Sequence, residues 1–208
     1  MDNAGIEVLI FDLGNVLIDF DHTIAAKRIS SFCDKSPQQI FDLFFASDIT
    51  TIFEEGKIPA SDFYLRVKEM LGLRLDYDSF VSIWNDIFFL SAKNRLLYSL
   101  INGLKGHYKT ALISNINTLH YEYVKERFPV FGVFHKVFTS FEVGAIKPSH
   151  LIYKKSLEAL GAKPESVFYT DDRVELVESA RELGIKGFPF TSVEQLKKDL
   201  SASGVNVN

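Results

Sequence analysis

The sequence has little of what several classes of protein need. It contains a single cysteine, Cys33, in 208 residues. One thiol forms no internal disulfide, which is typical of proteins in a reducing compartment. Positive charge is not in excess, since 23 Lys and Arg stand against 27 Asp and Glu, giving a net charge of −4. We therefore expect neither a nucleic acid nor an anionic membrane as a partner, because both bind basic surfaces.

Long apolar runs are also missing from the sequence. No stretch approaches the roughly 18 consecutive apolar residues of a membrane-spanning helix. The first residues include acidic Asp2 and Glu7 where a secretory signal would be basic, and the apolar run that follows ends at Asp12. We therefore expect a cytoplasmic protein.

Apolar and aromatic residues are plentiful. Hydrophobic residues make up 47% of the chain and aromatic residues 13%, including 19 Phe. This composition predicts a packed globular protein, and the length allows one large core with a small accessory domain.

Short apolar runs alternate with stretches of helical periodicity. The runs predict strands that are buried on both faces of a parallel sheet, and the alternation predicts an α/β, doubly wound fold. The predicted strands are Ile6–Phe11, Thr110–Ile113, Lys136–Thr139 and Val167–Thr170. Helices are predicted around residues 96–104, from Ser149 to Gly161, around residues 176–183 and from Ser192 to Leu200.

The stretch from about Phe20 to Leu90 breaks this alternation. It has helical periodicity and no apolar run typical of a buried strand, and Ser36-Pro37-Gln38-Gln39 is a strong helix start with a capping box. We predict a small helical bundle, residues 20–90, inserted into a doubly wound, Rossmann-like core made of residues 1–19 and 91–208.

Polar residues stand just beyond the predicted strands, where ligands of open parallel sheets bind. They are Asp12 after the first strand, Ser114 and Asn115 after the second, Lys147 in the loop after the third, and Asp171 and Asp172 after the fourth. Carboxylates, a hydroxyl, an amide and an ammonium suit a phosphoryl group that is bridged to Mg²⁺.

Four motifs resemble those of the haloacid dehalogenase superfamily and occur in the family's order. They are FDLGNVL (Phe11–Leu17), ISN (Ile113–Asn115), the Lys147-Pro148 pair in GAIKPSHLIY, and YTDDRVE (Tyr169–Glu175). The helical insertion resembles the cap between the first two motifs of one branch, whose recurring cap sequence is similar to FEEGKIPASDF (Phe53–Phe63). The FDLGNV opening resembles that of bacterial sugar-phosphate phosphatases of the α-glucose-1-phosphatase type.

The resemblance implies hydrolysis of a small phosphorylated metabolite by covalent catalysis. Asp12 would attack phosphorus and form an aspartyl-phosphate. Ser114 and the Asn115 amide would bind phosphate oxygens, and Lys147 would offset the negative charge.

The resemblance also implies Mg²⁺ as the cofactor. Its expected ligands are the Asp12 carboxylate, the Gly14 carbonyl and Asp172, with Asp171 binding directly or through water.

Gly14 departs from the family pattern. Most phosphatases of the family carry there a second Asp, which protonates the leaving group and then activates water. Loss of such acid–base help costs roughly 10²–10⁴-fold in rate. Three explanations are open: a leaving group that needs little protonation, substitution by Asp19, Asp21 or His22, or binding of phosphate compounds without efficient turnover.

A second departure is Leu176, where related sequences often carry Asn; Glu175 is a candidate for part of that role. A 2-haloacid dehalogenase, which would use Asp12 on carbon without metal, is an alternative function. Asp171 and Asp172 argue against it, because they would be idle without a cation. A pseudo-enzyme that binds a phosphorylated ligand is the non-catalytic alternative, with Gly14 marking the lost activity.

The cap contains many aromatic residues, which are more often core than pocket. The candidates for contact with substrate are Phe44, Phe45, Trp84 and Phe88, and Cys33 is expected to be buried in the cap.

Overall fold

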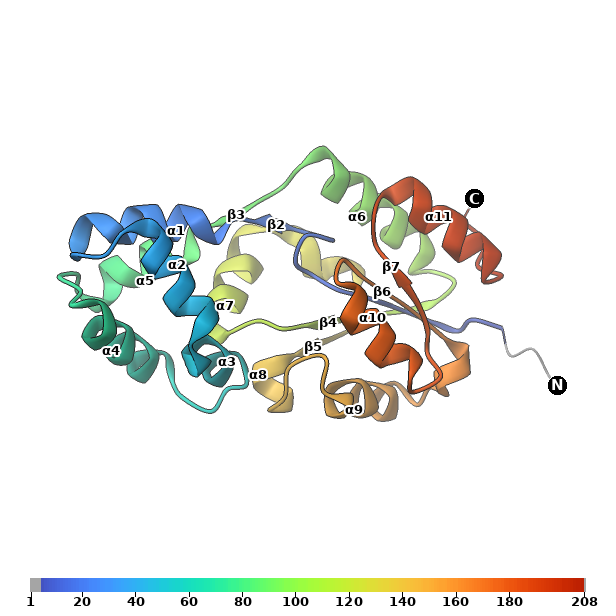
Figure 1. Ribbon diagram of the computed structural model, residues 1–208. Coiled ribbons are helices and arrows are strands. Elements are labelled where there is room, and N and C mark those ends of the chain that lie inside the picture. Colours follow the sequence, from blue (N-terminus) through green and yellow to red (C-terminus); the bar gives the residue numbers. More distant parts are fainter. Residues whose placement is uncertain (1–4, 208) are drawn as a thin grey trace.

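A parallel sheet forms the centre of the molecule (Figure 1). The computed structural model describes residues 5–207, apart from the side chains of Phe45 and Ala46. In this part of the chain the sheet has five strands in the order β5-β4-β1-β6-β7, and all neighbouring pairs are parallel. The strands are β1 (Val8–Phe11), β4 (Lys109–Ser114), β5 (Lys136–Thr139), β6 (Val167–Asp171) and β7 (Lys186–Pro189). The predicted α/β fold class is confirmed.

Helices cover both faces of the sheet. One face packs against α6 (Ala92–Leu104), α7 (Thr118–Arg127) and α11 (Val193–Ala202), and the other against α9 (His150–Leu160) and α10 (Val174–Arg181). On β1, Leu9 and Phe11 belong to the first apolar cluster, whereas Val8 and Ile10 belong to the second. Successive residues of a strand point to opposite faces, which explains why β1 is apolar throughout.

Several helix ends lie where the sequence predicts them. The Ser149 hydroxyl accepts a hydrogen bond from the Leu151 amide at the start of α9, and Gly161 ends that helix in the left-handed conformation with φ 62°. Ser192 likewise caps α11 by accepting from the Gln195 amide. Local capping chemistry therefore sets these boundaries.

The part of the chain inserted after β1 folds into helices that we call the cap. In the described residues these are α1 (His22–Ile29), α2 (Pro37–Ala46), α3 (Asp48–Glu54), α4 (Ala60–Leu71) and α5 (Tyr77–Asn85). The cap has its own apolar cluster, which includes Cys33. Its centre is aromatic, with the Trp84 ring 5.1 Å from Phe63 and 5.8 Å from Phe80. The predicted capping box at Ser36 is present.

An antiparallel ribbon joins the cap to the core. It consists of β2 (Asp19–Phe20) and β3 (Phe88–Phe89), at the points where the chain enters and leaves the cap. The sequence did not predict these strands, because two residues are too few to show an alternating pattern. It also missed β7, whose Gly187 and Pro189 are typical of loops; the edge position of β7 tolerates a proline.

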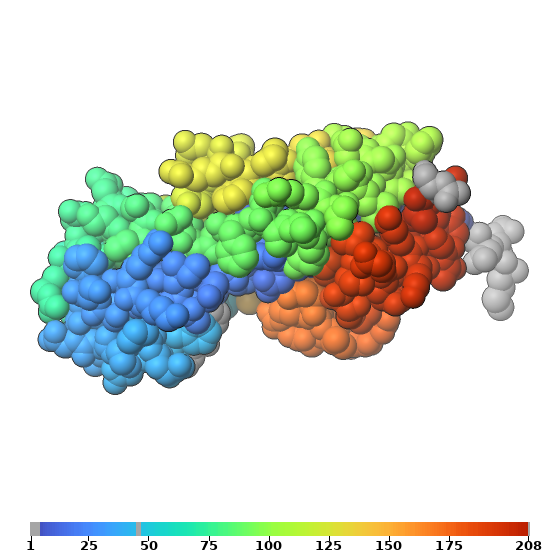
Figure 2. All heavy atoms as spheres, turned by 90° about the horizontal axis from the view of Figure 1, so that it is seen from above, coloured from blue at the N-terminus to red at the C-terminus, as the bar shows by residue number. Residues whose placement is uncertain are grey.

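The molecule is elongated, with the cap and the core as two lobes in line (Figure 2). Both ends of the described part of the chain lie on the core side, away from the cap (Figure 1). No helix in the described residues has the length and apolar character to cross a membrane. The remaining short elements of the described chain are α8 (Ser140–Val143) and the 3-10 helices Ser30–Phe32, Pro129–Val133 and Pro164–Ser166.

Candidate active site

Strand ends bring the predicted polar residues to one place. Asp12 follows β1, Ser114 ends β4 and Asp171 ends β6, and these strands are neighbours in the sheet. All three side chains are buried, and they line one pocket together with Lys147 and Asp172. These residues are up to 160 positions apart in the sequence, and Asp12, Ser114 and Asp171 meet because parallel strands end at the same edge of the sheet.

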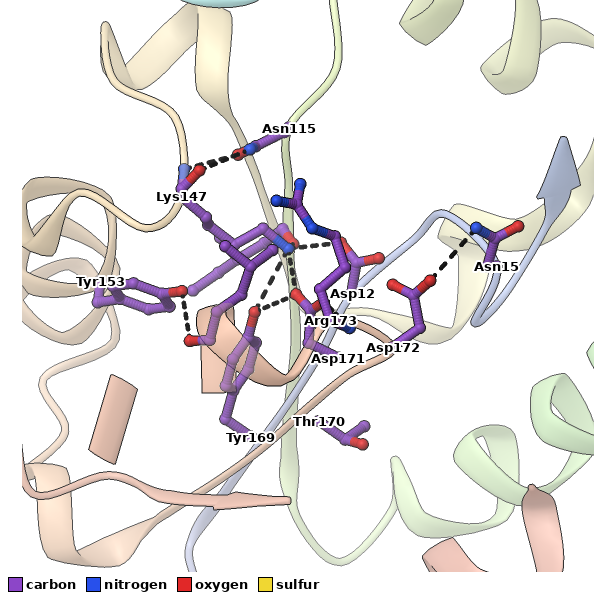
Figure 3. A network of polar contacts seen from close by, with 12 residues as sticks. Asp12, Asn15, Asn115, Lys147, Tyr153, Tyr169, Thr170, Asp171, Asp172 and Arg173 are labelled. Atoms are coloured by element: carbon purple, nitrogen blue, oxygen red, sulfur yellow. Dashed lines mark hydrogen bonds and ion pairs between the residues drawn. The ribbon is translucent and has the colours of Figure 1, made fainter. Parts of the chain in front are cut away.

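Lys147 is the centre of a buried polar network (Figure 3). Its Nζ atom lies 2.6 Å from Asp12 Oδ1 and 2.6 Å from Asp171 Oδ2. It also donates to the Ile113 carbonyl at 3.1 Å and lies 3.3 Å from the Tyr169 hydroxyl. Burial alone would lower the pKa of Lys147, but Asp12 and Asp171 raise it above its usual value. The ammonium therefore stays charged and holds both carboxylates in place.

Asn115 positions the loop that carries Lys147. Its side-chain oxygen accepts from the Lys147 amide at 2.7 Å, and its side-chain nitrogen donates to the Lys147 carbonyl at 2.9 Å. The Asn115 side chain is thus engaged with protein, which leaves its backbone for a ligand. The neighbouring Ser114 hydroxyl lines the pocket and makes no hydrogen bond to the residues that the structure describes.

Negative charge exceeds positive charge at the base of the pocket. Burial, Asp171 and Asp172 together raise the pKa of Asp12 to about 7, against the opposing effect of Lys147. Burial also raises the pKa of Asp172. For Asp171, Lys147 and the hydrogen bonds it accepts outweigh burial, so its pKa is lowered. Such an excess of carboxylate favours binding of a cation.

The same carboxylates are arranged as a candidate metal site. Oxygen atoms of Asp12, Asp171 and Asp172 lie within 4.8 Å of one another. Asp172 Oδ2 accepts from the Asn15 side chain at 3.2 Å (Figure 3). Oxygen-only donors and clustered negative charge fit Mg²⁺, which is a hard cation.

The contacts of Asp171 distinguish it from the other two carboxylates. Its Oδ2 accepts from Lys147 and from the Tyr169 hydroxyl, and its Oδ1 accepts from the Arg173 amide at 3.0 Å. Asp12 and Asp172 accept fewer hydrogen bonds from protein groups. They therefore have more oxygen lone pairs left for a cation.

Gly14 is packed against an aromatic ring. A Cβ atom at this position would lie 2.6 Å from Cε1 of Phe20, which belongs to β2. Phe20 thus fills the space that a larger side chain at position 14 would need.

The cap and α7 supply the remaining walls of the pocket. His22 and Glu54 come from the cap, Phe88 from β3, and His120 from α7. Burial lowers the pKa of His22 to about 4 and that of His120 to about 3, so both imidazoles are neutral near pH 7. Burial raises the pKa of Glu54 to about 7, against the attraction of Arg173.

Of the residues suggested as substitutes for the missing Asp, only His22 lines the pocket. Asp19 pairs with Lys93 at 2.6 Å, and Asp21 caps α1 by accepting from the Thr23 amide at 2.8 Å. Both carboxylates therefore have structural partners away from Asp12.

The aromatic residues predicted to contact substrate also divide between the pocket and the interior of the cap. Phe88 lines the pocket, but Phe44 and Trp84 pack against each other inside the cap, with ring centroids 4.7 Å apart. Those two predictions are wrong, because the cap needs large side chains for its own core. The side chain of Phe45 lies outside the described residues.

Glu175 and Leu176, where the fourth motif departs from the family pattern, point in different directions. Glu175 is exposed and pairs with Arg173 at 2.6 Å, so it points away from the carboxylate cluster. Leu176 is buried and lines the pocket. Glu175 does not take the place of the Asn found in related sequences.

Comparison with known families agrees with the motifs. Residues 6–184 match the haloacid dehalogenase-like hydrolases. The chain belongs to this family of hydrolases.

Two relatives of this hydrolase come from Bacteroides thetaiotaomicron. A D-ribitol-5-phosphate phosphatase is 24% identical over 189 residues, covering 88% of this chain and 91% of the relative. A crystal structure of a haloacid dehalogenase family enzyme in complex with magnesium and inorganic phosphate has a TM-score of 0.80 and 28% identity, covering 91% of this chain and 96% of the other. A predicted hydrolase of the family from Porphyromonas gingivalis shares the fold, with a TM-score of 0.78, 24% identity and coverage of 96% and 98%.

Some pocket residues of this hydrolase were missed by the sequence analysis. Glu54 and His120 line the pocket, yet neither directly follows a strand of the central sheet; Arg173 lies in the fourth motif but was assigned no role. The FEEGKIPASDF segment contains Glu54 and was recognised as a recurring cap sequence, so that likeness was the available signal. Nothing in the spacing of His120 distinguished it from the other histidines.

Proposed function

We propose that this hydrolase is a Mg²⁺-dependent phosphatase that acts on a small phosphorylated metabolite. The observation that carries the proposal is the buried cluster in which Lys147 joins Asp12 to Asp171, with Asp172 beside them. A metal-free reaction on carbon would leave Asp172 without a role, which disfavours a haloacid dehalogenase.

In the proposed reaction Asp12 is the nucleophile. One carboxylate oxygen of Asp12 is held by Lys147, and the other is left to attack phosphorus. The Ser114 hydroxyl and the Asn115 backbone amide would donate hydrogen bonds to phosphate oxygens. Lys147 would stabilise the negative charge shared by the nucleophile and the phosphate.

We assign the metal to Asp12, Asp172 and the Gly14 carbonyl. The hydrogen bonds already accepted by Asp171 favour contact through water for that residue. Asn15 would orient Asp172 by its hydrogen bond. Bound Mg²⁺ would shield Asp12 from the anionic substrate and neutralise charge on the transferring phosphoryl group.

The walls of the pocket support a small substrate. We propose that residues 1–19 and 91–208 form the catalytic domain and residues 20–90 a cap domain that closes over it. Phe20 and Phe88 offer apolar contact, and Glu54, Asn115 and Arg173 offer polar groups. A sugar or polyol phosphate fits this mixture, and D-ribitol 5-phosphate is the first candidate because of the relative named above.

Phosphate release from a substrate panel tests the proposal. The panel contains D-ribitol 5-phosphate, glucose phosphates and p-nitrophenyl phosphate, each with Mg²⁺ and with a chelator. We expect release that requires Mg²⁺ and is lost in Asp12→Asn, a nearly isosteric change that replaces the nucleophilic carboxylate by a neutral amide. If no substrate releases phosphate, the proposal is wrong, and chloride release from chloroacetate becomes the next assay.

A further inference from the structure

The chemistry just proposed lacks a group that moves protons, since Gly14 stands where relatives carry an acid. We propose that Glu54, at the end of α3 in the cap, is the general acid and base of the reaction. The inference rests on the proposed phosphatase function and adds a catalytic residue to it.

The cap end of the pocket places Glu54 opposite the nucleophile. Glu54 lines the same pocket as Asp12 and Asp172, although it comes from the cap and they come from the core. In the described part of the chain, its carboxylate makes no hydrogen bond and no ion pair. A half-buried carboxyl group without such a partner is available to a ligand in the pocket.

The backbone of Glu54 is anchored to the core. The Ser140 hydroxyl donates to the Glu54 carbonyl at 2.6 Å. The same Ser140 oxygen accepts from the Ile116 amide at 3.0 Å, two residues after the phosphate-binding Ser114. The backbone of Glu54 is therefore linked through Ser140 to the loop that follows β4, which holds the end of α3 beside the proposed phosphate site.

The usual acid–base position is closed in this chain. Phe20 occupies the space next to Gly14, where a Cβ atom would lie 2.6 Å from the ring. A proton donor must therefore approach the leaving group from another wall. Glu54 is on the cap side of the pocket, where the leaving group of a substrate bound at Asp12 would point.

The other titratable groups of the described pocket are poor alternatives. Lys147 and Asp171 hold each other, and Arg173 is permanently charged and paired with Glu175. His120 donates from Nε2 to the Trp84 carbonyl at 3.1 Å, which engages its ring in the structure.

His22 remains as the rival. Its ring packs 4.9 Å from Phe20 and 6.1 Å from His120, and burial lowers its pKa to about 4. An imidazole with this pKa is almost never protonated near pH 7, so it is a poor acid. The pKa of Glu54 is instead raised by burial to about 7, which suits a group that must both give and take a proton.

With Glu54 as the acid and base, bonds and protons balance in both steps of the reaction. In the first, the Asp12 carboxylate forms a bond to phosphorus, the bond to the ester oxygen breaks, and that oxygen takes the proton of the Glu54 carboxyl group. In the second, water attacks phosphorus and gives a proton to the Glu54 carboxylate. The bond to Asp12 breaks, its electron pair returns to the carboxylate, and phosphate leaves.

Glu54→Gln tests the inference, with Glu55→Gln as the matched control. Glu55 is the adjacent glutamate and pairs with Lys57 at 2.6 Å. With the best sugar or polyol phosphate of the panel, we expect kcat to fall roughly 10²–10⁴-fold in Glu54→Gln and to stay unchanged in Glu55→Gln. Glu54→Asp keeps the carboxyl group on a shorter side chain and should retain more activity than Glu54→Gln. This comparison keeps the inference testable if Glu54→Gln fails to fold.

p-Nitrophenyl phosphate separates proton transfer from a structural role. Its leaving group needs no proton, so Glu54→Gln should release about one nitrophenolate per active site rapidly and then slow down. The phosphorylated Asp12 should accumulate and be detectable by mass after an acid quench. A merely structural defect would slow the first turnover as well.

The outcomes distinguish this inference from the proposed function. If the wild type turns over and Glu54→Gln behaves like Glu55→Gln, or if His22→Gln alone gives the burst, Glu54 is not the acid and base, while the phosphatase function stands. If the wild type releases no phosphate from any substrate, both proposals fail.

Discussion

At the scale of single residues, position 14 and position 20 exclude each other's large side chains. Phe20 also packs against His22 and Phe88, with ring centroids 4.9 and 6.0 Å away, so its ring is not free to move aside. The absence of an acid at position 14 is therefore coupled to the aromatic ring at position 20 rather than being an isolated loss.

A double-mutant cycle measures this coupling. Gly14→Asp should lower the free energy of unfolding by about 1–3 kcal/mol, because the new side chain overpacks against Phe20. In a Phe20→Ala background the same change should cost at least about 1 kcal/mol less. Urea denaturation of the four metal-free proteins gives the values. Additive losses would show that the two positions are independent.

The residues of the site were predictable to different degrees. Asp12, Ser114 and Asp171 were found because each follows a buried strand, and parallel strands end at one edge of the sheet. Glu54 reaches the same pocket through the packing of α3 on the core, and no periodic pattern encodes where one helix packs on a distant loop.

At the scale of elements, His120 connects a core helix to a cap helix. From α7, its Nε2 donates to the carbonyl of Trp84 on α5, and its Nδ1 lies 3.1 Å from the Asn117 side-chain nitrogen, from which it accepts. This pairing assigns the neutral tautomer with the proton on Nε2. Protonation would place a second N–H against the Asn117 amide, so the neutral form is favoured.

The pH dependence of stability should report this neutral imidazole. The pKa of His120 in the folded protein is lowered to about 3, so below about pH 6.5 the unfolded chain binds a proton that the folded protein does not. Stability is therefore lost as pH falls. Between pH 7 and pH 5, His120→Gln should lose about 2 kcal/mol less than the wild type in urea denaturation.

An exposed histidine provides the control for that measurement. His107→Gln should keep the pH dependence of the wild type, because His107 is exposed on the core. Part of the acid sensitivity should survive in His120→Gln, since His22 also has a lowered pKa. Equal pH dependence in the two variants would contradict the role given to His120.

Some strands and helix ends could be predicted from the sequence and others could not, for physical reasons. Buried strands such as β6 are visible as apolar runs, and the predicted strand Val167–Thr170 ends one residue before the observed end at Asp171. Of the two edge strands, β5 has the predicted bounds Lys136–Thr139, whereas Gly187 and Pro189 hid β7. The two-residue strands β2 and β3 are specified by their pairing with each other. Helix ends were readable where a cap residue such as Ser149 or Ser192 marks them.

At the scale of the whole molecule, the backbone of the cap lies very close to the backbone of the core at one point. Just beyond α3, Gly56 has φ +67°, and a Cβ atom there would collide with the carbonyl oxygen of Phe141 on α8. The Ser140 hydroxyl bond to the Glu54 carbonyl lies next to this contact. Together they fix how α3 of the cap lies against α8 beside the pocket that contains Asp12.

Gly56→Ala should disturb this contact between the cap and the core, and Gly72→Ala is its matched control. Gly72 ends α4 at φ +62° with no atom within 4 Å of an added Cβ, so both variants share the left-handed strain of about 1–2 kcal/mol. Only Gly56→Ala must also push α3 away from α8. We expect Gly72→Ala to lose stability with kcat/KM unchanged, and Gly56→Ala to lose kcat/KM by roughly 10²-fold, because catalytic groups on the two lobes are misplaced. Equal kcat/KM in both variants would mean that closure of the pocket does not depend on this contact, and thermal melts of both proteins separate that result from simple unfolding.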